Sequence, residues 1–90
     1  MPIIKIPTPL RAYTNGLKEV SVKGENVKAA LQSLRILYPD IGKNLYNDDG
    51  ELHPFVNISL DGNHIKELQG LDTPLAEDDH LQIIPSISGG

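Results

Sequence analysis

Leu81-Gln82-Ile83-Ile84-Pro85-Ser86-Ile87-Ser88-Gly89-Gly90 closes the sequence: it begins as an apolar strand, passes a proline and ends in two glycines. A chain end without side chains is slender and can enter a channel that any Cβ would block. It also lacks contacts that would hold it to a domain, so we expect residues 86–90 to form a flexible tail. Two terminal glycines arise by chance in about one chain in 200. The rest of the chain must therefore decide whether Gly90 is a chemical group presented to another protein.

Composition limits the classes of protein to which this chain can belong. Its 90 residues predict one domain, and 39% hydrophobic with 22% charged residues fit a globular chain. A net charge of -4 argues against nucleic-acid binding. No apolar run approaches a membrane span and no signal-peptide core follows Met1, so we expect a cytoplasmic protein without membrane association. The absence of cysteine excludes disulfides, thiolate nucleophiles and thiolate metal sites.

The N-terminal quarter predicts a β-hairpin. Ile3–Ile6 is β-branched and flanked by prolines, which indicates a short strand with Ile4 and Ile6 toward the core. The proline-rich segment Pro7–Arg11 should form a turn region. Asn15-Gly16 then favours positive φ and leads into a second strand, 17–22.

One amphipathic helix gives the strongest periodic signal. Asn26 is a plausible N-cap, and Pro39 should end the helix. Residues 40–53 are expected to be loop. The apolar stripe at helical spacing comprises Val27, Ala30, Leu31, Leu34, Leu37 and Tyr38.

The C-terminal half predicts strands around a short irregular segment. Residues 55–60 alternate, and 64–66 could be a short edge strand, whereas 70–75 should be an irregular or single helical turn. The final strand, 81–84, should lie beside the first. One helix cannot cover both faces of such a sheet, so we predict an α+β roll spanning residues 1–85, with a mixed four- to five-stranded sheet packed on one main helix.

No enzymatic site emerges from the residue pattern. His53, His64 and His80 lack ligand partners at i+3 or i+4, which argues against a metal site. The paired loop acids Asp48-Asp49 and Asp78-Asp79 lack calcium-loop spacing. Outward-facing apolar residues suggest instead a docking surface at Phe55 and Ile84, which Ile3 could join; scattered surface residues or a phase error of one residue explain the pattern equally well.

These features together resemble the MoaD/ThiS-type ubiquitin-like sulfur carriers, which have the β-grasp fold. The segments that carry the resemblance are Pro7–Arg11 with Thr14–Gly16, Tyr38-Pro39, 55–58, 70–75 and 78–90. It implies a carrier rather than an enzyme, without a cofactor of its own. An E1-like enzyme would use ATP to adenylate Gly90, and sulfur would then displace AMP to leave a thiocarboxylate. Gly89 and Gly90 match the family's diglycine end; Phe55, Ile84, Pro85 and Ile87 are our inferred docking residues.

The resemblance is greatest to the cysteine-biosynthesis (CysO-like) branch, in which the acceptor is a PLP-dependent cysteine synthase that uses an activated serine. Molybdopterin-type carriers, which act on the large subunit of molybdopterin synthase, usually have a second proline where Ser86 stands. Two further classes stay open: a ubiquitin-like modifier that forms isopeptide bonds through Gly90, and a binding domain with an incidental glycine tail.

Overall fold

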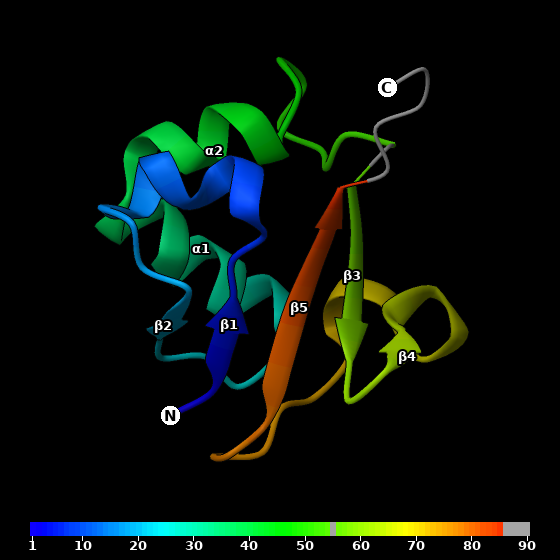
Figure 1. The fold of residues 1–90 in the computed structure, drawn as a ribbon. Coiled ribbons are helices and arrows are strands. Elements are labelled where there is room, and N and C mark those ends of the chain that lie inside the picture. The colour runs from blue at the N-terminus through cyan, green and yellow to red at the C-terminus, as the bar shows by residue number, and fades with distance from the viewer. Residues whose placement is uncertain (55, 86–90) are drawn as a thin grey trace.

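The described residues form a mixed five-stranded sheet. The structure is a computed structural model that describes residues 1–54 and 56–85 (Figure 1). Its strands are β1 (Ile3–Lys5), β2 (Glu19–Ser21), β3 (Val56–Leu60), β4 (Asn63–His64) and β5 (His80–Pro85). Their order is β2-β1-β5-β3-β4. Strand β5 pairs parallel with β1 and antiparallel with β3, which confirms the predicted mixed sheet and the place of the last strand beside the first.

Helix α1 (Val27–Leu37) follows the predicted N-cap. The Asn26 side chain accepts a hydrogen bond from the backbone N–H of Ala29 at 2.8 Å. The first four residues of the predicted stripe are buried. Leu37, however, is 55% exposed and Tyr38 is only half-buried. The stripe is wrong at Leu37, which lies at its margin in the last turn. Tyr38, where the backbone leaves the helical region (φ -134°, ψ 80°), still packs against the core.

A second helix corrects the expected loop at 40–53. Helix α2 spans Pro39–Leu45 and buries Ile41 and Leu45. Pro39 ends α1, as predicted, but it is also well suited to the first turn of a helix, where its missing N–H costs nothing. The turn after α2 is closed by Asn47, whose Oδ1 accepts from the N–H groups of Asp49 (3.0 Å) and Glu51 (3.1 Å).

Several other boundaries differ from the expected ones, including those of β1 (Ile3–Lys5, expected to reach Ile6) and β5 (His80–Pro85, expected as 81–84). The proline-rich segment contains a 3-10 helix, η1 (Thr8–Thr14), and β2 is shorter than 17–22. Strand β4 begins at Asn63, because Asp61 and Gly62 at positive φ already complete the two-residue turn. The chain then enters a 3-10 turn, η2 (Ile65–Glu67), where a strand was expected. The turn η3 (Gly70–Asp72) agrees with the single helical turn expected within 70–75.

The core lies between the helices and one face of the sheet. Ile4, Val20, Ile58, Leu81 and Ile83 point toward the helices and are at most 7% exposed. Alternation along the strands places Lys5, Glu19 and Gln82 on the opposite face, where all three are exposed. No helix in residues 1–54 and 56–85 is long and apolar enough to cross a bilayer.

Candidate functional site

Strand β5 fixes the base of the C-terminal segment. It is central in the sheet, with β1 on one side and β3 on the other. Leu81 and Ile83 are 0% and 1% exposed, so the inward-facing side chains of β5 are buried in the core up to Ile83. Pro85, the last described residue, lies opposite Val56 of β3 and is half-buried. In Figure 1, β1 and β5 point the same way, so the C-terminal ends of both strands lie at one end of the sheet.

The predicted docking residues are only partly brought together. Ile84 lies on the open face, 37% exposed, opposite Asn57. Ile3 shares that face but pairs with His80, four residues before Ile84, so the two isoleucines are separated by about 13 Å along the strand. Phe55, Ile87, Gly89 and Gly90, as well as the predicted tail 86–90, lie outside the described residues.

A basic hollow lies near the same end of the sheet. It has a volume of about 390 Å³, and its lining includes Lys5, Arg11, Lys18, Glu19 and Gln82. Sequence reasoning missed this cluster because its cations are six or seven residues apart along the chain. The only available signal was the hairpin register, which brings the second strand beside the first.

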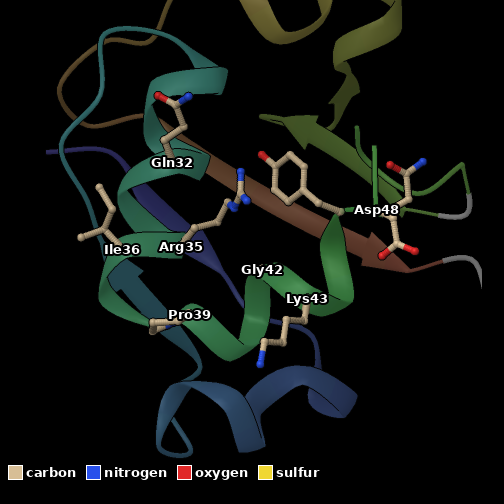
Figure 2. Close-up of a pocket in the computed structure, with 9 residues that line it drawn as sticks. Gln32, Arg35, Ile36, Pro39, Gly42, Lys43 and Asp48 are labelled. Carbon is tan, nitrogen blue, oxygen red and sulfur yellow. The ribbon is translucent and has the colours of Figure 1, made fainter. Parts of the chain in front are cut away.

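A larger hollow lies on the helical side (Figure 2). Its volume is about 690 Å³, and Arg35, Gly42 and Tyr46 are among its lining residues. Burial raises the pKa of Tyr46, while the charge of the Arg35 guanidinium and its hydrogen bond to the phenol act in the opposite direction. Its residues come from α1, α2 and the turn after α2, and none comes from β5. This hollow is therefore not part of the C-terminal site.

The described histidines and acids do not assemble a metal site. Within residues 1–54 and 56–85, no three His, Asp or Glu side chains converge in a way that could hold an ion. His53, His64 and His80 belong to a loop, β4 and β5 respectively.

Comparison with known proteins identifies the family. The model of the ThiS family matches residues 4–90. The chain belongs to the ThiS family. The sulfur carrier protein CysO of Mycobacterium tuberculosis (strain ATCC 25618 / H37Rv) is 36% identical to this chain over 89 residues, which are 97% of this chain and 96% of the relative.

Solved structures of similar proteins share the fold. The Amycolatopsis orientalis BexX/CysO complex contains a chain that matches with a TM-score of 0.89, 29% identity and full coverage of both chains. The small archaeal modifier protein 1 from Methanosarcina acetivorans matches with a TM-score of 0.88 and 33% identity, covering 99% of this chain and 95% of that one. The β-grasp fold and the resemblance to MoaD/ThiS-type ubiquitin-like sulfur carriers are thereby confirmed.

Proposed function

We propose that this ThiS-family chain is a sulfur carrier in cysteine biosynthesis, with the carboxylate of Gly90 as the group that carries sulfur. The observation that supports it most is the 36% identity to the sulfur carrier protein CysO across nearly the whole of both chains. The family match also extends through Gly89 and Gly90. In this proposal the chain has no catalytic residue, and a partner enzyme uses the ATP.

The chemistry requires activation of the terminal carboxylate. A carboxylate is a poor electrophile, so its oxygen first attacks the α-phosphorus of ATP on an E1-like enzyme, forming an acyl-adenylate and releasing pyrophosphate. Hydrosulfide, the simplest sulfur donor, then attacks the carbonyl carbon; the bond to AMP breaks and a thiocarboxylate forms. Because the chain has no cysteine, none of its own thiols can compete for the adenylate.

In this proposal the domain binds the partner enzyme, and the segment after Pro85 carries the terminal group into its active site. Five residues follow Pro85, which in extended form span about 17 Å. That distance lets the terminal group enter a buried site while the domain stays outside it. We propose that Ile84 and Pro85, with Phe55 and Ile87, contact the partner enzymes around the entrance of that site.

The acceptor proposed is a PLP-dependent cysteine synthase that binds an activated serine. The thiocarboxylate sulfur would bond to the side-chain carbon of that serine as its activated oxygen leaves. The product would be a thioester to Gly90, and its hydrolysis would release cysteine and restore the Gly90 carboxylate. A molybdopterin synthase large subunit is the alternative acceptor within the same chemistry.

A second candidate function, a ubiquitin-like modifier, is favoured by the similarity to small archaeal modifier protein 1. It would share the adenylation step but transfer the Gly90 carbonyl carbon to a lysine amine. Lysine-linked conjugates in extracts of the native host would support this function, whereas a carrier alone would form none.

The decisive experiment is intact-mass spectrometry of the protein purified from its native host, repeated after incubation with the E1-like enzyme, ATP and sulfide. We expect the mass increase of one oxygen-to-sulfur replacement, located at Gly90 by fragmentation. The control is a variant that lacks Gly90, for which we expect no change. The carrier function would be refuted if the mass of the unsubstituted protein stays unchanged, provided that the same E1-like enzyme is shown to be active on its known carrier.

A further inference from the structure

The cations of this acidic protein are concentrated in its N-terminal quarter. Residues 1–24 contain four of the eight Lys and Arg residues but only one of the twelve acids. Those four are Lys5, Arg11, Lys18 and Lys23. The quarter is therefore net positive on a chain whose formal charge is -4.

Three of these cations line the basic hollow beside β5. Lys5 lies on the open face of β1, between Glu19 of β2 and Gln82 of β5. The Nε of Arg11 donates to the backbone carbonyl of Ile6 at 3.1 Å, which holds this side chain near the end of β1. Lys18 lies across from Ile6, whose N–H donates to the Lys18 carbonyl at 2.8 Å. The backbone thus presents all three cations around one hollow.

In the described part of the chain, none of these three cations forms an ion pair within 4.0 Å, although Glu19 lies across from Lys5. There, the ion pair within 4.0 Å joins Lys43 and Asp40, on α2. Lys5 and Lys18 are exposed and Arg11 is half-buried. Their charges are therefore available to a partner protein, which would not have to break an ion pair to bind them.

The hollow is close to the base of the tail. Gln82 and Ile83 belong to its lining. Pro85 follows Gln82 by three residues, so the hollow lies about 10 Å from the point where the tail begins. The surface of a partner protein that binds the terminal group will therefore lie close to these cations.

We propose that this basic hollow docks onto an acidic surface of the E1-like adenylating enzyme; the inference rests on the proposed function. A compact anion fits poorly, because the acidic residue Glu19 belongs to the same lining. An acidic protein surface can instead pair with Lys5, Arg11 and Lys18 separately. The negative charge elsewhere on the domain would repel that surface, so the encounter is oriented with the tail toward the enzyme.

The first test compares two double variants with equal charge change. Lys5→Gln with Lys18→Gln removes two cations of the hollow, and Lys28→Gln with Lys66→Gln removes two exposed cations elsewhere. The readout is ATP–pyrophosphate exchange by the E1-like enzyme as a function of carrier concentration. We expect the hollow variant to raise KM for the carrier about five- to tenfold with kcat unchanged, and added salt to reduce that difference. We expect the control variant to match the unsubstituted protein.

Two outcomes of this test would overturn the inference. Equal effects of both double variants would mean that only net charge matters. If the hollow variant has an unchanged KM for adenylation but transfers sulfur more slowly to the acceptor enzyme, the surface binds that acceptor instead.

A second test is independent of adenylation. Hexaglutamate peptide, a probe for an acidic surface, is titrated into ¹⁵N-labelled protein. We expect amide shifts centred on Lys5, Arg11, Lys18 and Gln82, absent in the hollow variant and kept in the control variant. Shifts spread evenly over all lysines would refute the site. If the peptide binds here but the enzyme never activates Gly90, the proposed function and the assignment to that enzyme fail, and only the binding of acidic surfaces by the hollow stands.

Discussion

The guanidinium carbon of Arg35 lies 4.1 Å from the centroid of the Tyr46 ring. This contact joins α1 to the segment that follows α2. Tyr46 also forms an isolated antiparallel bridge with Leu52, and the N–H of His53 donates to the Leu45 carbonyl at 2.9 Å. The pair therefore helps to hold the connection that leads into β3, the strand that faces Pro85.

Replacing Arg35 should weaken the fold modestly. We expect Arg35→Ala to lower the free energy of unfolding by about 0.5–1 kcal/mol, because a cation over an aromatic face at an exposed site contributes about that much. The measurement is urea denaturation. Lys28→Ala is the matched control, since Lys28 is also exposed on α1. Equal effects of the two substitutions would show that the ring contact contributes nothing.

Tyr46 should make stability depend on alkaline pH. Burial raises its pKa above the ordinary value of 10.0, so the folded protein holds the phenolic proton more tightly than the unfolded chain. Its contribution is complete below about pH 10 and is lost as pH rises through the folded pKa. We expect the stability advantage of the unsubstituted protein over Tyr46→Phe to shrink as pH rises above 10. A difference that grows over this range would contradict the direction of the shift.

Gly42 should be coupled to Arg35. A Cβ on Gly42 would lie 3.1 Å from Arg35 Nε and 3.2 Å from its Cγ, so the arginine must move. Gly42→Ala alone should be near neutral, because a helix-propensity gain of about 1 kcal/mol offsets the weakened ring contact. In an Arg35→Ala background the same change should stabilise by about 1 kcal/mol.

The control for this double-mutant cycle is Gly24→Ala. There the added Cβ would lie 2.5 Å from the backbone nitrogen of Ala30, which cannot swing away. We expect this change to be destabilising by the same amount with or without Arg35. Strict additivity of Gly42→Ala and Arg35→Ala would contradict the proposed coupling.

Asn26 should stabilise the start of α1. Asn26→Ala removes the acceptor for the Ala29 N–H, and we expect a loss of about 1 kcal/mol in thermal or urea unfolding. Asn26→Asp should keep most of the stability, because its carboxylate can accept the same hydrogen bond. An Asn26→Asp variant as unstable as Asn26→Ala would mean that the cap contributes in another way.

Ile84 should matter for partner binding rather than for folding. We expect Ile84→Ser to raise KM for the carrier in the adenylation assay by about tenfold, since burying an isoleucine contributes about 1.5–3 kcal/mol. Ile36→Ser is the matched control, because Ile36 is 79% exposed on α1. Equal values for the two variants would remove Ile84 from the proposed docking surface.

Much of this architecture could be predicted because the hydrophobic periodicity and the turn-forming residues indicate the same helices and strands. The alternation at Leu81 and Ile83 placed the last strand in the core, and the apolar spacing after Asn26 placed α1. Helix α2 is the main element that the prediction lacks: Pro39 predicts the end of α1, but it also fits the first turn of a helix, and Ile41 and Leu45 have helical spacing. The basic hollow was missed for another reason: its cations meet through strand register and a 3-10 helix, which the local pattern does not encode.

The double-sided pairing of β5 also has a mechanical consequence. If a partner binds and releases the chain end as proposed, a pull on Pro85 would be transmitted along β5 to the hydrogen bonds that this strand shares with β1 and β3. Because these bonds run across the direction of such a pull, they are loaded together in shear instead of opening one after another. Separating β5 from the sheet would therefore require several of these hydrogen bonds to break at once.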